Sequence, residues 1–367
     1  MKHYFTSESV TAGHPDKICD QISDAILDEA LQQDPFSKMA VECTIKDNFI
    51  LIYGEANTKA SLSYETIAKE VIASVGYQED FEATVKVAQQ SPEINQAVAG
   101  SESIGAGDQG IIFGYACNET ENLMPLSIEL AHKLAKQLEV SFKTDENSPL
   151  QPDGKTQVTV EYIDDKISRI DTIVVSSQHI AAITQEALQN YIRKNVIDIV
   201  VDPSLVDENT KYIINPSGSF VIGGPFGDSG TTGRKIIVDT YGGHGRIGGG
   251  CFSSKDATKV DRSAAYYCRY VAKNIVANKL ADKCEIQVSY AIGMSQPLSL
   301  FIETFQTNQV ELTKIYDFVN NNFDFGVQNI IEELDLRKPI YRKTSTYGHF
   351  GRTDIIFPWE KIKETVI

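Results

Sequence analysis

Alternation of apolar and polar residues marks three pairs of strands along the chain. Two alternating runs with a period of two residues, joined by a short polar interval, predict a β-hairpin. The predicted hairpins join 39–45 with 49–53, 157–162 with 170–175, and 284–290 with 298–303. They recur at roughly even distances, which indicates a repeated unit rather than one continuous sheet.

Helix-like stretches follow these hairpins, and the clearest are 61–75 and 179–193. The repeated pattern predicts an α/β fold of the α+β type, with a pseudo-threefold internal repeat of mixed sheet plus helices. The length of 367 residues agrees with several subdomains, because single hydrophobic cores stop growing at about 250–300 residues. We place three related subdomains at 1–100, 105–220 and 222–362.

Composition narrows the class of protein. The 42% hydrophobic and 23% charged residues are ordinary for a globular chain, and no run of about 18 apolar residues suggests a membrane span. The first eight residues hold no apolar core of a signal peptide, so we expect a cytoplasmic protein. A net charge of −16 repels nucleic acid. An anionic ligand must therefore be held by a local cluster of Lys and Arg.

The cysteines offer no metal site or disulfide framework. They are scattered, with no CxxC pair and no zinc-finger spacing. We expect them to be reduced core residues. The six are Cys19, Cys43, Cys117, Cys251, Cys268 and Cys284.

A helix is predicted to begin at Pro15, because proline suits the first helical position and apolar residues recur on one face after it. A helix N-terminus attracts anions, and His14 stands beside this one. Asp16 could hold a cation against a phosphate, or belong to an ordinary acidic helix start. Asp20 and Asp24 follow at four-residue steps, and we interpret them as a solvated acidic stripe.

Two glutamates lie in or at the end of the first hairpin. A carboxylate among apolar strand residues needs a partner, and for Glu42 and Glu55 a monovalent cation or a substrate ammonium would serve. The alternative is that both face solvent on an alternating hairpin.

Two regions lose periodicity and fill with small residues. The first, 89–110, predicts a functional loop, commonly a lid. The second, 215–250, is dense in glycine around an apolar run, 235–239, that we interpret as a strand. Within it, 223–235 is typical of a phosphate-cradling loop, since small residues expose N–H groups and two cations close it, although no Walker A motif is present.

The pattern Gly243-x-Gly245-x-x-Gly248 matches the dinucleotide fingerprint. We reject an NAD enzyme, because the last glycine does not open a helix and the next helix begins only near Asp261. Lys255 and Lys259 precede this helix start, and Asp261 lies in its first turn. An acidic residue for a metal ion and lysines for phosphate would suit a polyphosphate site; the alternative is an ordinary helix cap.

Together these stretches resemble the methionine adenosyltransferase family over essentially the whole chain. The motifs stand in family order: Gly13-His14-Pro15-Asp16-Lys17, Gly105-Ala106-Gly107-Asp108-Gln109-Gly110, Gly223-Gly224-Pro225 through Asp228, 233–243 and 259–266. Chance does not plausibly produce that order.

The resemblance implies a role for each matching position. Its catalytic residues would be His14, Lys155 and Arg234. ATP would be surrounded by His14, Asp153, Lys155, Phe220, Asp228, Arg234, Lys235 and Lys255. Methionine would be held by Glu55, Gln90, Asp108, Asp228 and Lys259. Asp16 and Asp261 would bind magnesium and Glu42 potassium, with two Mg²⁺ and one K⁺ in each site.

The family also implies a reaction and an assembly. The methionine sulfur attacks C5′ of ATP, and the expelled triphosphate is hydrolysed to pyrophosphate and phosphate. The active sites would be shared between subunits of a homodimer or homotetramer, with 90–107 as a mobile gate loop. Two alternatives stay open: another ATP- or polyphosphate-using transferase, and a non-catalytic nucleotide sensor.

This sequence departs from the family pattern at three positions. Ser219 stands where the family usually has arginine, and Cys251 and Ser254 replace small residues of a glycine-rich run. Losing a guanidinium near a multiply charged leaving group could cost up to a few kcal/mol. We therefore expect weaker triphosphate binding unless Arg234 and Lys235 compensate.

Overall fold

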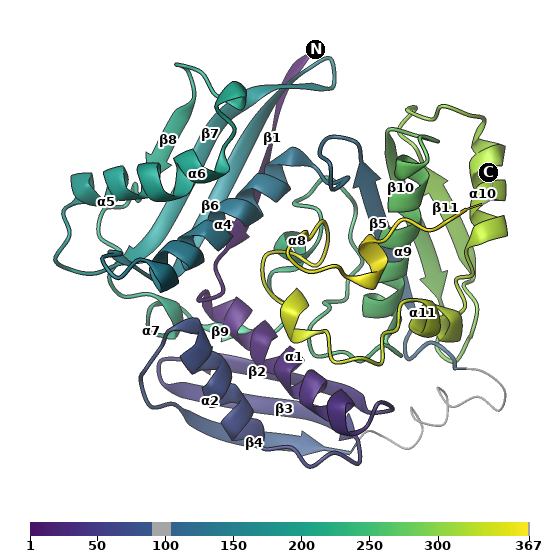
Figure 1. Ribbon diagram of the computed structural model, residues 1–367. Helices are drawn as coiled ribbons and strands as arrows, with labels where there is room; N and C mark the ends of the chain where they lie inside the picture. Colours follow the sequence, from purple (N-terminus) through teal and green to yellow (C-terminus); the bar gives the residue numbers. More distant parts are fainter. Residues whose placement is uncertain (90–103, 366–367) are drawn as a thin grey trace.

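Three sheets lie around a centre that holds the long helices α1, α4 and α9 (Figure 1). This computed structural model describes residues 1–89 and 104–365. The helices are α1 (Pro15–Gln33), α2 (Tyr64–Val75), α4 (Leu126–Thr144), α5 (Gln185–Ile192), α6 (Asp198–Val200), α7 (Gly224–Gly227), α8 (Ile236–Asp239), α9 (Val260–Ala277), α10 (Leu312–Asn322) and α11 (Val327–Glu333).

Each sheet contains one of the predicted hairpins. The first has the order β1 (Lys2–Val10), β6 (Leu150–Ile163), β7 (Lys166–His179), β8 (Lys211–Ile214). The second has the order β4 (Glu82–Ala88), β3 (Phe49–Asn57), β2 (Lys38–Lys46), β9 (Gly230–Thr231). The third has the order β11 (Ser299–Glu303), β10 (Lys283–Tyr290), β5 (Gly110–Cys117). The antiparallel pairs β2·β3, β6·β7 and β10·β11 confirm the hairpins, and the α+β fold class is confirmed with them.

Strands cross between the predicted subdomains. β1 pairs with β6, β5 pairs with β10, and β9 pairs with β2. Each predicted subdomain therefore lends one strand to the sheet of another. The boundaries at 1–100, 105–220 and 222–362 stay a prediction, because sheet membership does not follow them.

Burial follows the alternation that the sequence shows. On β2, Met39, Val41, Cys43 and Ile45 are at most 1% exposed, while the residues between them are partly exposed. α1 packs on β2, α4 on β1 and β6, and α9 on β5 and β10. The sheets thus turn one face towards the central helices, and the core lies between the two layers.

The predicted strand at 235–239 is wrong. The segment forms the short helix α8, in which the Asp239 N–H donates to the Lys235 carbonyl at 2.8 Å. In this helix the Asp239 carboxylate is buried beside its ion-pair partner Lys17, so the segment does not alternate as an apolar strand would. α9 begins at Val260, which confirms the predicted helix start and the rejection of a dinucleotide fingerprint.

The cysteines are all free, as expected, and only Cys251 is partly exposed. Among the described residues, no helix is long and apolar enough to cross a membrane.

Candidate functional site

The N-terminus of α1 forms the centre of the candidate site. Pro15 occupies the first helical turn and His14 is the N-cap, whose Nδ1 accepts the Asp16 N–H at 3.2 Å. The His14 side chain is buried, and burial and then the Lys235 ammonium lower its pKa to about 3. His14 is therefore neutral near pH 7. Because Nδ1 accepts, Nε2 carries the proton and can donate to a ligand.

Asp16 joins this helix to the glycine-rich loop 223–235, which we call the glycine loop. Its Oδ1 accepts the Thr231 N–H at 2.9 Å, and its Oδ2 receives the Lys235 ammonium at 2.5 Å. Burial alone would raise the Asp16 pKa, but these two donors outweigh it and lower the pKa. Gly230 permits the approach, since a Cβ there would lie 2.2 Å from the Pro15 carbonyl oxygen. The arrangement places two cations, Arg234 and Lys235, beside a helix N-terminus, which suits a polyphosphate.

Asp153 and its neighbours complete this group. Oδ2 of Asp153 accepts the Gly224 N–H at 2.8 Å, whereas Oδ1 has no partner among the described residues. Burial raises the pKa of Asp153 to about 6. The charges of Lys155 and Asp228 act on both His14 and Asp153, which places them nearby, and both side chains are exposed. We call the following the first group: His14, Asp16, Asp153, Lys155, Asp228, Arg234 and Lys235.

The interpretation of Asp20 and Asp24 as a solvated stripe is wrong. Both are 0% exposed. Asp20 pairs with Lys17 at 2.9 Å, and Asp24 forms a bidentate pair with Arg262 at 2.7 Å for each oxygen. The four-residue spacing places both carboxylates on a helix face, but Lys17 of the same helix and Arg262 of α9 pair with them and the face is buried.

A second group gathers at the N-terminus of α9. Lys255 pairs with Asp261 at 2.6 Å, and Lys259, the N-cap residue, pairs with Asp256. The Gly107 N–H donates to the Thr258 carbonyl at 3.1 Å, which brings the exposed Asp108 next to this helix start. We call the following the second group: Asp108, Lys255, Lys259 and Asp261.

Within the part of the chain that the structure describes, the two groups are not bonded directly to each other. Among the described residues, no hydrogen bond or ion pair joins a member of the first group to a member of the second. They approach each other around α8, because Ile236 and Asp261 line the same pocket of about 370 Å³.

Glu42 and Glu55 point away from the core face of their hairpin. Glu42 is partly exposed and accepts a hydrogen bond from the Tyr53 hydroxyl at 3.4 Å, and Glu55 is exposed. This geometry leaves Glu42 without a cationic partner in the described parts of the chain. Gln90 lies outside the described residues, as does most of the predicted gate at 90–107.

Phe220 lies in the loop after β8 and is held by its backbone. Its N–H donates to His179 Nε2, and its carbonyl accepts the His179 N–H, both at 3.0 Å. Ser219 before it is exposed.

The other two departures are packed. A Cβ on Gly233 would lie 2.6 Å from the Cys251 sulfur, so that thiol sits against the backbone of the glycine loop. Ser254 adopts φ 81°, a conformation that favours glycine, and its N–H donates to Asp24 at 3.1 Å. Neither side chain contacts a member of the two groups directly through a hydrogen bond.

The described residues hold no preformed metal cage, since no three His, Cys, Asp or Glu side chains converge in ranges 1–89 and 104–365. Magnesium does not require one. It is usually bound by one or two carboxylates together with substrate phosphates and water. Single carboxylates such as Asp16 and Asp261 therefore fit a magnesium ion that arrives with a nucleotide.

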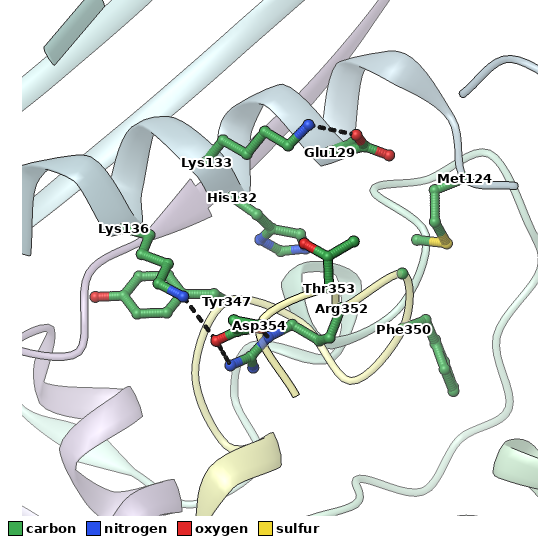
Figure 2. A pocket seen from close by; sticks show the side chains of 11 residues that line it. Met124, Glu129, His132, Lys133, Lys136, Tyr347, Phe350, Arg352, Thr353 and Asp354 are labelled. Carbon is green, nitrogen blue, oxygen red and sulfur yellow. Dashed lines mark hydrogen bonds and ion pairs between the residues drawn. The ribbon is translucent and has the colours of Figure 1, made fainter. Parts of the chain in front are cut away.

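A separate pocket of about 470 Å³ lies between α4 and the loop 347–354 (Figure 2). Lys136 pairs there with Asp354, and Lys133 with Glu129. None of the residues predicted for the site lines this pocket.

Sequence reasoning missed the buried residues behind the first group. Lys17 contacts Asp20 and Asp239, and Thr231 donates to Asp16. The spacing of Lys17 and Asp20, three residues apart on a helix, was a usable signal. Nothing in the sequence pointed to Asp239, because it lies in a segment that we had interpreted as a strand.

Comparisons with known proteins agree with this geometry. The N-terminal, central and C-terminal domain models of S-adenosylmethionine synthetase match residues 2–100, 103–220 and 222–361. The S-adenosylmethionine synthase of Brachyspira hyodysenteriae is 51% identical over 377 aligned positions, which cover 98% of this chain and 96% of that protein. The chain therefore belongs to the S-adenosylmethionine synthetase family.

Proposed function

We propose that the protein makes S-adenosylmethionine from ATP and L-methionine and hydrolyses the released triphosphate to pyrophosphate and phosphate. One observation supports this most: Asp16 at the N-terminus of α1 is bonded to Lys235 and to the Thr231 amide, with a neutral His14 beside it. The group combines helix dipole, cations and a carboxylate, as binding of a magnesium–triphosphate chain requires.

The chemistry needs alignment and charge stabilisation rather than a base. A thioether sulfur is a neutral nucleophile, so its lone pair attacks C5′ directly, forming the S–C bond as the C–O bond to the triphosphate breaks. Lys155, Arg234, Lys235 and Lys255 would stabilise the charge that develops on the leaving oxygen and the phosphates. Each cation–anion pair at 4 Å is worth about 4 kcal/mol at an effective dielectric near 20.

His14 has a narrower role in this proposal. Its pKa of about 3 leaves it uncharged, and its Nε2–H can donate to the ribose end of ATP. His14 would thus orient the reacting carbon and help the chemical step without accepting a proton. We expect His14→Asn to lower turnover about tenfold or more. Full turnover with normal affinity for both substrates would contradict this role.

The remaining roles follow the family. Asp153, Asp228 and Phe220 would complete the ATP site, with Phe220 against the adenine. Methionine would be held by Glu55, Gln90, Asp108, Asp228 and Lys259. Asp16 and Asp261 would hold magnesium, two ions per site, and Glu42 one potassium ion. Bound magnesium would neutralise triphosphate charge.

We further propose a homodimer or homotetramer with active sites shared between subunits. The lack of a direct bond between the two groups in the described part of the chain supports it, because the first group of one subunit could face the second group of another. Large apolar side chains that are about half exposed on strands of all three sheets also support it, because a partner subunit could cover them. They are Tyr4 (50% exposed), Phe49 (45%), Ile111 (54%) and Phe301 (45%). The cytoplasmic location and the gate at 90–107 are part of the same proposal.

The first experiment measures products. Purified protein is incubated with ATP, methionine, magnesium and potassium, and S-adenosylmethionine, pyrophosphate and phosphate are followed by chromatography. Omission of methionine or of either cation provides the controls. Methionine-dependent formation of all three products is expected. ATP binding without an adenosylated product would favour the nucleotide sensor, and an ATP-dependent product on another acceptor would favour a different transferase.

A further inference from the structure

Lys17 is buried between two carboxylates behind the first group. Its ammonium donates to Asp20 at 2.9 Å and to Asp239 at 2.5 Å. The side chains of these three residues are 1%, 0% and 2% exposed. Both carboxylates are held away from water, and Lys17 has no exposed atom with which to meet a substrate. Lys17 can therefore influence the reaction only through other residues.

Through these two carboxylates, Lys17 and Asp20 of α1 anchor both ends of one short segment, 233–239. Asp20 Oδ1 accepts the Gly233 N–H at 2.8 Å. At the other end, the Asp239 carbonyl accepts the His349 N–H at 3.0 Å, while the Asp239 N–H closes the turn onto Lys235 at 2.8 Å. Arg234 and Lys235, the two cations of the glycine loop, lie between these two anchoring points.

Lys17 also follows Asp16 directly on α1. The helix that carries Asp16 and the segment that carries Lys235 are therefore joined twice, once at the site by the Asp16–Lys235 pair and once behind it by Lys17. A buried charge network is rigid when its members are held on both sides. The Asp20 carboxylate accepts from both Lys17 and the Gly233 N–H, while Asp239 is held by Lys17 at its carboxylate and by Lys235 and His349 at its main chain.

From this arrangement we infer that Lys17 is a positioning residue, which fixes Arg234 and Lys235 relative to Asp16 and His14 without touching the substrate. This inference rests on the proposed function, because it assigns those four residues to the triphosphate. It gives a specific reason for a buried lysine in a place where an apolar side chain would satisfy packing alone.

The test uses Lys17→Arg and Asp20→Asn. Arginine keeps the charge but not the geometry of a compact ammonium, and asparagine keeps an acceptor for Gly233 while removing the ion pair. We expect kcat for S-adenosylmethionine formation to fall about 10- to 100-fold, as for other residues that orient a site from behind, with the KM for methionine unchanged. Affinity for magnesium tripolyphosphate, measured by calorimetry, should fall about tenfold. If Lys17→Arg fails to fold, Asp20→Asn carries the same measurement.

A matched control is the buried pair of Arg269 with Glu360, at 3.1 Å. Glu360→Gln should lower the melting temperature and leave kcat per folded molecule unchanged. If Lys17→Arg and Asp20→Asn behave in the same way as this control, Lys17 has only a structural role and the inference is overturned.

A double-mutant cycle identifies the residue through which Lys17 acts. If Lys17 acts through Lys235, then Lys17→Arg should no longer weaken tripolyphosphate binding in a Lys235→Met background. Additive losses would overturn the inference. A wild-type protein that makes no S-adenosylmethionine would refute the proposed function instead, and the tripolyphosphate cycle would still decide the role of Lys17.

Discussion

The N-termini of α1 and α9 each carry an aspartate paired with a lysine, but they are built differently. Asp16 is 3% exposed, and its lysine partner, Lys235, comes from a distant part of the chain. Asp261 is 20% exposed, and its partner Lys255 lies six residues before it. A backbone N–H from Thr231 also fixes Asp16, whereas only Lys255 bonds to the carboxylate of Asp261 among the described residues.

The difference indicates that the charges at the α1 end are preorganised, whereas those at the α9 end can adjust to a ligand. The α1 end is held by tertiary contacts, so its charges are in place before a ligand arrives. The α9 end is held by a local pair that water partly screens, so Lys255 can exchange its carboxylate for a phosphate at low cost. We expect substitutions at the two ends to differ accordingly.

The largest effect is expected from neutralising the carboxylates. Asp16→Asn should lower kcat about 100- to 1,000-fold, because it removes the proposed magnesium ligand and releases Lys235 from its position. Asp261→Asn should lower kcat less, since its surroundings can adjust. Steady-state kinetics over a range of magnesium concentrations measures both. Equal losses, with equal magnesium dependence, would remove the distinction between the ends.

The free energy of unfolding should distinguish Lys235 from Lys255. Lys235→Met leaves the Asp16 carboxylate buried without its cation, and we expect the free energy of unfolding to fall by about 2–3 kcal/mol. Lys255→Met breaks a partly exposed pair and should cost about 1 kcal/mol or less. Urea denaturation of both variants measures this. A larger loss for Lys255→Met would contradict our description of the two ends.

The pH dependence of stability tests Asp153 at the α1 end. Its pKa is raised from 3.8 to about 6, so the folded protein favours the protonated carboxyl. Between those two pH values the unfolded state binds fewer protons, and this residue makes the protein less stable as pH rises. Asp153→Asn should remove that loss and exceed the wild type by on the order of 1–3 kcal/mol at pH 7, with the difference vanishing below pH 4. Urea titrations from pH 4 to 8 decide the sign.

The smallest effect concerns the missing arginine beside the first group. Ser219 is exposed, so Ser219→Arg can be accommodated and adds a cation near the predicted ATP site. We expect ATP or tripolyphosphate affinity to rise a few-fold. Ser219→Gln is the uncharged control. An unchanged or weaker affinity would mean that Arg234 and Lys235 already supply the positive charge that triphosphate binding needs.

Periodicity predicted the hairpins, and Pro15 with the apolar repeat after it predicted the start of α1, because those features depend on neighbours in sequence. The helix predicted over 179–193 begins later, because β7 continues to His179 and α5 begins only at Gln185 after its N-cap Thr184. The surroundings of Asp20 and Asp24 could be predicted only in part, since Lys17 is a neighbour of Asp20 on α1, whereas Gly233 and Arg262 are supplied by tertiary folding. The apolar run at 235–239 reads as a strand, but its conformation and the burial of Asp239 against Lys17 depend on tertiary contacts.

The members of the site were inferred from family motifs, and the structure brings most of them into two groups. Asp16, Arg234 and Lys235 lie together, as do Lys255 and Asp261. No local pattern could show which residues share a group, because Asp16 and Lys235 are far apart in sequence and meet only through tertiary folding. Their individual roles stay predictions.

The exchange of strands between sheets has a consequence for a growing polypeptide. β1 is synthesised long before its partner β6. β5 likewise stays unpaired until β10, which ends at Tyr290, has been synthesised. No sheet is complete until a distant segment has been translated, so the nascent chain must carry unpaired edges for much of its synthesis. Fragments cut at the apparent subdomain boundaries would each lack a strand, and for that reason we expect them to aggregate rather than fold on their own.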